Sequence, residues 1–332
     1  MVSIYRAIGK LTPNGKYRTL ANMHDEDLSA PLLRRFLAYA ARGTQSNMER
    51  AERGLFPSTD AQTEFARSLA EELKAIGLAD VRLDERSYVL ARVPATPGLE
   101  SKPSFGLCAH MDTASDAPGD GVKPITHEKY DGKIITLKEG FFIDPATDKD
   151  LAACGEAYAR GEADTIITSD GTTLLGADDK AGLAGIVTMA EWLIAHPEFP
   201  HGPIELLFSP DEETGHGMDH VPLGELKSKA FYTVDGGQEG EIETECFNAW
   251  KAEVSFTGVS AHLGAARGKL VNAATMAACF VASLPAQESP ETTDGYLGYF
   301  CPLDIRGSVE EATVIVFLRD FEEDGMERRL DR

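Results

Sequence analysis

The chain has 332 residues, a formal net charge of −22 at pH 7 and a sequence pI near 4.7. Its length allows two domains, its acidic balance excludes binding to nucleic acid or anionic membranes by charge, and its apolar runs stay short of the ~20 residues that span a bilayer. The five cysteines are odd in number and widely spaced, and no secretory signal opens the sequence, so we expect buried, reduced thiols in a cytoplasmic protein.

The first part of the chain contains several helical patterns, which begin after a polar opening segment. Residues 1–28 are polar and aperiodic, which predicts a loosely held extension. In "PSTDAQTEFARSLAEELKAIGL" apolar residues recur at helical spacing, with Thr59 and Gln62 as a candidate capping box and Gly77 placed to end the helix. Further helices are expected in "APLLRRFLAYA" and over residues 181–195.

Short apolar segments separate these helices. The strand patterns are "SYVLARVP", "SFGLCAHMD", "PIELLFSP" and "AFYTVDGG". Strands that alternate with helices predict the α/β class, with a central, mostly parallel sheet in a first domain over residues 29–246.

The pattern changes after Gly240. Strand-like "NAWKAEVSFTGVS" is followed by helical "KLVNAATMAACFVASLP" and by two more strand-like segments, "GYFCPLDIRGSVE" and "EATVIVFLRDF". This order predicts a smaller α+β domain with an antiparallel sheet over residues 247–332. The charged run after Arg319 is typical of a helix that is beginning.

Side chains that could bind a metal follow the predicted strands. In "LCAHMDTA", His110 and Asp112 are two apart and would point to the same side of an extended chain, where the carboxylate could hold the imidazole. This short pattern is common without a metal. Asp178 and Asp179 precede a helix, and capping of that helix is the alternative.

An acidic triplet, Asp211-Glu212-Glu213, stands where a buried strand is expected to end. Adjacent carboxylates repel one another, and burial raises that cost unless a cation lies among them. Asp235 follows another predicted strand. A solvated polar turn is the alternative at both places.

All four stretches would meet at one edge of the sheet, because ligands in open α/β sheets bind beyond the carboxyl ends of the strands. One histidine and several carboxylates, without cysteine, suit zinc, cobalt or manganese. Two ions could share one carboxylate and activate a water between them. The sequence therefore predicts a metal centre in which one glutamate binds metal and its neighbour takes a proton from the water.

Several motifs in the same order resemble the peptidase T family of tripeptide aminopeptidases, within the co-catalytic zinc exopeptidases. They are "TSDGTTLLGADDKAG", "SPDEETGHG", "YTVDGGQEGEIETECFNAW" and "QESPETTDGYLGY", and the similarity runs from about Leu32 to the last residue. The resemblance implies a catalytic metallopeptidase domain over residues 29–246 and a lid or dimerisation domain over residues 247–332.

The resemblance also implies a ligand set for two zinc ions. His110 and Asp235 would hold one zinc, Asp178 would bridge both, and Glu213 would hold the second.

It assigns catalysis to two further carboxylates. Glu212 would be the general base and Asp112 would orient the imidazole of His110, while Asp179 and Asp211 are not ligands in the family pattern.

The stretch "GVSAHLGAARGKLVNAA" matches the start of the family's lid domain. His262 corresponds there to a histidine that helps to hold the substrate carbonyl oxygen, sometimes across a dimer, so a homodimer is one expected assembly. A surface histidine is the alternative, and Leu263 stands where the family usually has proline.

Family members continue beyond the point where this sequence stops, through a second lid helix, a last lid strand and a segment that carries a Gly-rich loop and the final zinc histidine. No histidine follows His262. We therefore expect an incomplete lid and one tight zinc site in place of two.

The predicted function is a metal-dependent aminopeptidase that releases the N-terminal residue of tripeptides. Short peptides are the expected partners, and neither nucleic acid nor a membrane is. Another amide hydrolase of the family (a dipeptidase, carboxypeptidase or deacylase) and an inactive truncated metal-binding remnant are the alternatives.

Overall fold

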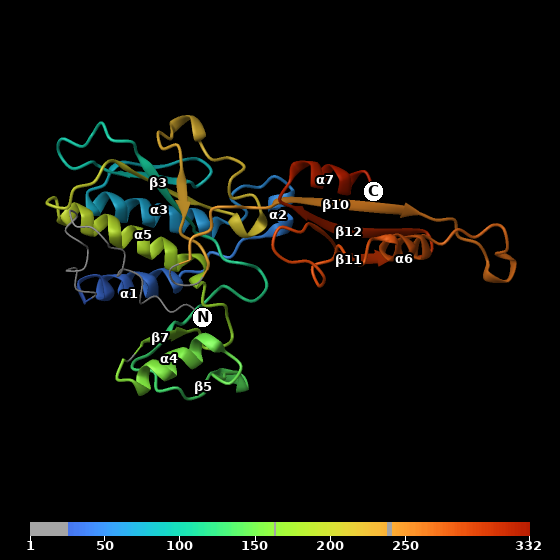
Figure 1. Ribbon diagram of the computed structural model, residues 1–332, viewed down its shortest axis with the longest axis horizontal. Helices are drawn as coiled ribbons and strands as arrows, with labels where there is room; N and C mark the ends of the chain where they lie inside the picture. The colour runs from blue at the N-terminus through green and yellow to red at the C-terminus, as the bar shows by residue number, and fades with distance from the viewer. Residues whose placement is uncertain (1–25, 163, 238–240) are drawn as a thin grey trace. The chain divides into compact units, whose positions relative to one another are not determined.

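A computed structural model describes residues 26–162, 164–237 and 241–332 (Figure 1). The chain divides into two compact units, residues 1–241 and residues 242–332, and each is described by itself. The predicted extension over residues 1–28 lies outside the described residues, except for its last three, which begin helix α1.

The first unit is built on a five-stranded sheet, in agreement with the predicted α/β class. Its strand order is β1-β2-β8-β3-β9, and β3 pairs parallel with both β8 and β9, while β2 runs antiparallel to its two neighbours, β1 and β8. The sheet is therefore mixed. Its parallel part consists of β8, β3 and β9, and the candidate site residues lie at or just after the ends of these strands. The bounds of the strands are β1 Ala79–Leu83, β2 Val89–Val93, β3 Phe105–His110, β8 Ile204–Ser209 and β9 Phe231–Thr233.

Two helices, α3 (Asp60–Ile76) and α5 (Ala177–Ala195), pack against this sheet, and α1 (Glu26–Ala40) packs against α5 (Figure 1). The apolar stripe of α3 faces the sheet, as its spacing predicts, and Gly77 ends the helix in the left-handed conformation. Strand β8 has six buried residues, which is typical of a strand covered on both faces. A short helix, α2 (Met48–Glu52), precedes α3.

The predicted capping box of α3 is wrong. Thr59 is the N-cap residue, but its side chain makes no capping bond and instead donates to the carbonyl oxygen of Gln45 at 2.9 Å. Nε2 of Gln62 donates to Oγ1 of Thr59 at 3.1 Å, but its Oε1, the acceptor that a capping box would use, accepts the backbone N–H of Asp211, 149 residues further along the chain.

Residues 125–168 form a small substructure that the sequence patterns did not reveal. Strands β4 (Ile125–His127) and β7 (Ile166–Thr168) pair with each other, as do β5 (Ile135–Thr136) and β6 (Phe142–Ile143). Helix α4 (Lys149–Ala159) packs on them through a separate apolar cluster.

The second unit is a three-stranded antiparallel sheet in the order β10-β12-β11, with helices α6 and α7. Every second residue of β12 from Ala312 to Leu318 is buried, and these side chains pack against α6 and Met326 of α7. The predicted order of strand, helix, strand and strand is confirmed. The bounds are β10 Asn248–Thr257, α6 Ala273–Ser283, β11 Tyr299–Gly307, β12 Glu311–Asp320 and α7 Glu323–Leu330.

The cysteines are thiols, but their predicted burial holds only in part. Cys108 and Cys154 are buried, whereas Cys246 and Cys279 are exposed. Cys279 lies on the side of α6 that faces away from the sheet.

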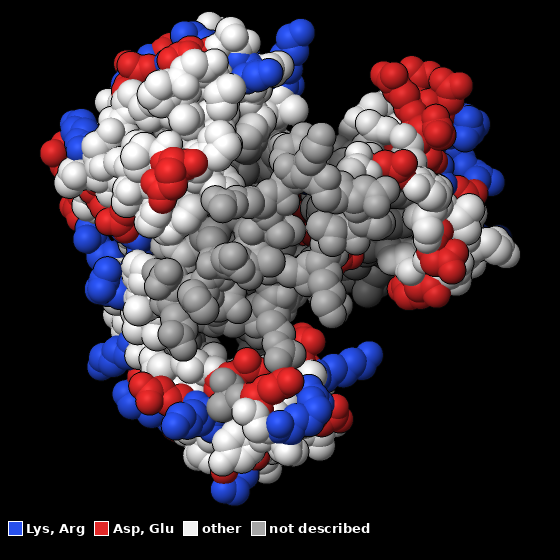
Figure 2. All heavy atoms as spheres, turned by 60° about the vertical axis from the view of Figure 1, so that its left-hand side comes forward, with Lys and Arg blue, Asp and Glu red and all other residues white. Residues whose placement is uncertain are grey.

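The surface carries charges of both signs. On the face shown in Figure 2, the described lysine and arginine side chains stand beside acidic ones. Within the ranges described, no helix is both long enough and apolar enough to cross a membrane.

Candidate metal centre

The carboxyl ends of the parallel strands bring the candidate residues together. His110 is the last residue of β3, Asp235 follows β9 by two residues, and Glu212 and Glu213 lie in a 3-10 turn, η3 (Glu212–Thr214), shortly after β8. Asp178 belongs to the irregular first turn of α5. Side chains that are far apart in sequence therefore share one edge of the sheet.

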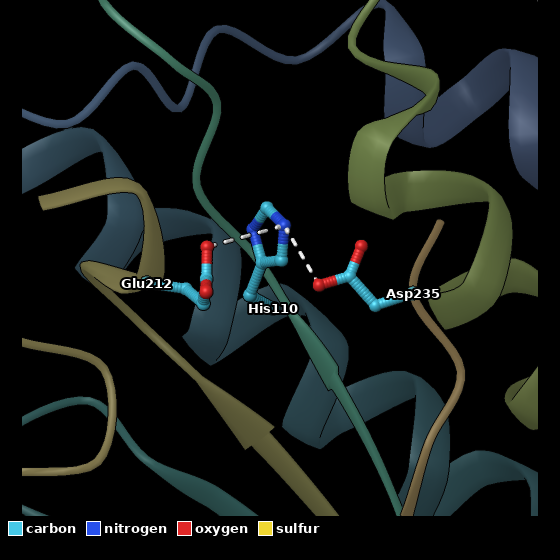
Figure 3. Close-up of side chains that lie close together, drawn as sticks. All are labelled: His110, Glu212 and Asp235. Atoms are coloured by element: carbon cyan, nitrogen blue, oxygen red, sulfur yellow. Dashed lines mark ion pairs between the residues drawn. The ribbon is translucent and has the colours of Figure 1, made fainter. Parts of the chain in front are cut away.

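The imidazole of His110 is the centre of the group. Its ring is 2% exposed, and Nε2 lies 2.9 Å from Oδ1 of Asp178, 3.8 Å from Oδ2 of Asp235 and 3.9 Å from Oε2 of Glu212. Figure 3 shows this ring between the carboxylates of Glu212 and Asp235. Three acidic side chains thus converge on one ring nitrogen.

The other ring nitrogen is held from behind. Nδ1 of His110 lies 3.1 Å from the carbonyl oxygen of Asp112 and 3.3 Å from its Oδ1. Both atoms are acceptors, so the proton belongs on Nδ1, and in the neutral ring this leaves the Nε2 lone pair directed at the acidic side chains.

The carboxylate of Asp112 also holds the turn over residues 211–214, called the acidic turn, and the sequence does not indicate this contact. It is fully buried and accepts the backbone N–H groups of Glu212 at 3.0 Å and Glu213 at 3.1 Å. One side chain therefore fixes both the imidazole and the turn.

Asp179 has a structural contact in place of a ligand role. It is buried, and its Oδ2 accepts the backbone N–H of His110 at 3.1 Å. Burial, with the charge of Asp235, raises the pKa of Asp179 to about 8.

Crowding of negative charge is visible in the pKa values of the other carboxyl groups. Burial, and then the charge of Asp178, raise the pKa of Glu213 to about 7. Burial also raises the pKa of Asp235 to about 6, assisted by the charges of Asp178 and Glu212 and opposed by His110. Burial alone would lower the pKa of His110, but its hydrogen bonds with Asp112 and Asp178 raise it to about 11.

These residues fit a divalent cation. Within the described ranges, two sets of three side chains have ligand atoms that all lie within 4.8 Å of one another: His110, Glu212 and Asp235, and His110, Asp178 and Glu213. A cation among these oxygens would offset the burial and the repulsion that raise the pKa values of Glu213 and Asp235. Both sets use His110.

His262 lies in the second unit and is described there alone. It is exposed at the start of a 3-10 turn, η5 (Leu263–Ala265), and its Nδ1 accepts the N–H of Gly264 at 3.2 Å. Because Nδ1 accepts, the neutral ring carries its proton on Nε2.

Sheet and site together define an α/β protein with a metal-capable centre of one histidine and several carboxylates. The family model "Peptidase dimerisation domain" matches residues 244–330. Peptidase T of Bacillus licheniformis is 45% identical over 302 residues, covering 90% of this chain and 71% of that protein.

Two solved structures share the fold. A tripeptidase from Staphylococcus aureus superposes with a TM-score of 0.64 at 20% identity, and it covers 91% of this chain and 69% of its own. Aminopeptidase PepT from Bacillus cereus gives 0.61 at 24% identity, with the same shares. The chain belongs to the peptidase T family, and the resemblance predicted from the sequence motifs is confirmed.

Proposed function

We propose that this protein is a metal-dependent aminopeptidase that removes the N-terminal residue of tripeptides. Membership of the peptidase T family supports the activity, and the neighbours named tripeptidase and aminopeptidase indicate the substrate class. The observation that carries the proposal is the convergence of Asp178, Glu212 and Asp235 on Nε2 of His110.

Four side chains would hold the metal: His110, Asp178, Glu213 and Asp235. Zinc is the ion that we propose, because one imidazole with carboxylates and no thiolate suits it. When bound, the ion would supply Lewis-acid polarisation of the peptide carbonyl and a lower pKa for the attacking water. Because His110 is common to both sets of metal-capable side chains and can give its Nε2 to one ion only, we expect about one tight ion per chain.

Glu212 would act as the general base. Its carboxylate is half exposed and stands 3.9 Å from Nε2 of His110, so it reaches both the site and solvent. There it can accept the proton of the attacking water on Oε2 and pass it to the leaving amine. Such assistance accounts for about 100- to 10,000-fold in rate.

Asp112 would position both partners, since it holds Nδ1 of His110 and the backbone of the acidic turn. For His262 we propose a contact from Nε2 to the substrate carbonyl oxygen. The matched dimerisation domain supports a homodimer as the working assembly.

The test is hydrolysis by the purified chain, with product identity read by mass spectrometry. After dialysis against a chelator and addition of zinc, Leu-Gly-Gly should yield leucine and Gly-Gly. The same tripeptide with an acetylated amino group should be cleaved poorly, and Leu-Gly should be a weaker substrate. Equal cleavage of the acetylated peptide would exclude an aminopeptidase and favour a carboxypeptidase or deacylase.

A further inference from the structure

The first residue of the acidic turn, Asp211, has a side chain that points away from the metal centre. It is fully buried, and its carboxylate accepts hydrogen bonds from the segment that leads into helix α3. The backbone N–H of Ser58 donates to Oδ2 at 2.6 Å, and the hydroxyl of Ser58 donates to Oδ1. Nε2 of Gln62 donates to Oδ1 as well, at 2.8 Å.

Gln62 returns a second bond to the same residue. Its Oε1 accepts the backbone N–H of Asp211 at 2.9 Å, and both residues are fully buried. The two bonds form a closed pair that fixes the orientation of the amide, since a flipped amide would set donor against donor and acceptor against acceptor. Asp211, Gln62 and Ser58 are called the rear clamp below.

This clamp decides where the acidic turn goes. Asp211 has a backbone φ of 54°, in the left-handed region that aspartate tolerates better than most residues. The chain therefore bends sharply just before Glu212 and Glu213, whose N–H groups then meet Asp112 on the opposite side. The turn is held from two sides, by Asp112 in front and by the rear clamp behind.

Ordinary helix capping does not explain the contacts. Asp211 occupies the N-cap position of the 3-10 turn, yet its side chain makes no capping bond there. All three donors to its carboxylate come from Ser58 and Gln62, across 149 residues or more of sequence. The hydrogen bonds of this buried carboxylate therefore hold the turn against the start of α3.

We propose that Asp211 is a positioning residue of the metal centre, which acts through the rear clamp to place Glu213 as an ion ligand and Glu212 as the proton acceptor. It touches neither the ion nor the substrate. The inference rests on the proposed function for the part of Glu212, but the part of Glu213 is tested by ion binding alone.

The sharpest perturbation is Asp211→Asn, which preserves shape. An asparagine has one acceptor and one donor where two acceptors are required, so its NH₂ group must face either the N–H of Ser58 or the NH₂ of Gln62. We expect the affinity of the full chain for Co²⁺ to fall about 10- to 100-fold, with a changed visible absorption spectrum of the bound ion. The kcat for tripeptides should fall about 100-fold, the order expected for a displacement of about 1 Å.

A reciprocal exchange provides the rescue. In the double variant Asp211→Asn with Gln62→Glu, the amide and the carboxylate change places, so that the amide at position 211 donates to the carboxylate at position 62. The hydroxyl of Ser58, which lies 3.3 Å from Nε2 of Gln62 in the parent chain, can turn to donate to that carboxylate. Co²⁺ affinity and spectrum should return to within about threefold of the parent chain, a residual that standard double-mutant cycles resolve. Gln62→Glu alone should be as damaging as Asp211→Asn, because two carboxylates would then face each other.

Glu205→Gln is the matched control. Glu205 is another buried carboxylate of the first unit, on strand β8, and it accepts the backbone N–H groups of Lys227 and Ser228. Its substitution should lower thermal stability without changing Co²⁺ affinity. Should Asp211→Asn prove too unstable to purify, Ser58→Ala should shift Co²⁺ affinity in the same direction by a smaller factor. It removes the hydroxyl that donates to Oδ1 of Asp211 and accepts the backbone N–H of Asn47 at 2.8 Å, but it keeps the backbone N–H that donates to Oδ2.

The outcomes separate clearly. If Asp211→Asn or Ser58→Ala behaves like Glu205→Gln, losing stability with unchanged Co²⁺ affinity and spectrum, Asp211 has only a structural role and the inference is overturned. Recovery of stability without recovery of Co²⁺ affinity in the double variant overturns it too. A parent chain that binds Co²⁺ but cleaves no tripeptide contradicts the proposed function, while the Co²⁺ measurements still decide the role of Asp211. A parent chain that does not bind Co²⁺ overturns both.

Discussion

Replacement of Asp112 by asparagine perturbs three contacts with one isosteric change. The buried carboxylate faces Nδ1 of His110 at 3.3 Å and accepts the N–H groups of Glu212 and Glu213 at 3.0 and 3.1 Å. The single oxygen of an asparagine can serve one N–H group of the turn, and its NH₂ group then opposes the other. Loss of one bond to a charged acceptor, together with one buried unsatisfied donor, should cost about 3–6 kcal/mol of unfolding free energy.

The ion should respond in parallel. Removing a carboxylate that orients a metal-binding histidine typically weakens metal affinity about 10- to 100-fold. Zinc affinity is to be measured by competition with a chelating dye, and stability by urea unfolding of the ion-free chain. Asp320→Asn is a suitable control, because Asp320 is a buried carboxylate of the second unit that pairs with Arg329 at 2.6 Å. It should lower stability alone, and an Asp112→Asn chain with the zinc affinity of the parent would refute the role given to Asp112.

Three further predictions concern the same centre. Glu212→Gln should retain zinc but lose about 100- to 10,000-fold in kcat, whereas Glu213→Gln should weaken zinc binding in a dye-competition titration; normal turnover by Glu212→Gln would rule out its role as the base. His110→Ala should sharply lower zinc content measured by atomic absorption, while His216→Ala should not. His216 follows the acidic turn in sequence, and its Nδ1 lies 2.7 Å from Oδ2 of Asp219. Equal loss from both variants would contradict the ligand assignment. Zinc affinity should fall as pH falls, by about tenfold or more per unit below pH 7. The reason is that the ion must displace a proton from His110 (pKa about 11) and, at lower pH, from Glu213 (pKa about 7) and Asp235 (pKa about 6). A zinc affinity that calorimetry found constant across pH 5.5–8 would contradict this.

The elements that could be predicted from the sequence are those whose signal is local. The apolar spacing of α3 and the glycine at its end depend only on neighbours along the chain, and both are found in the structure. Strand β8 is recognisable from its apolar residues, which only Glu205 interrupts before Ser209. The substructure over residues 125–168 was missed because its strands are only two or three residues long, too short to display a period.

The contacts that position the site were a different matter. Gln62 has the right spacing from Thr59 for a capping box, yet both its Nε2 and its Oε1 form hydrogen bonds with Asp211, which is distant in sequence. Asp112 was expected to hold His110, and its bonds to the backbone of the acidic turn had no signature in the sequence. Local rules of this kind cannot anticipate a partner that only the folded sheet brings near.

The side chains of the metal centre come from the ends of strands and the turns beyond them, while the sheet beneath is held by apolar packing. The half-buried carboxylates of Glu213 and Asp235 carry a cost of burial and repulsion that the fold does not need. Neutral residues at these positions would therefore tend to raise the stability of the ion-free chain and to lower its metal binding and activity. In an evolutionary lineage that no longer used the reaction, selection for stable protein would replace these acidic residues first, and the fold would be retained after the activity was lost.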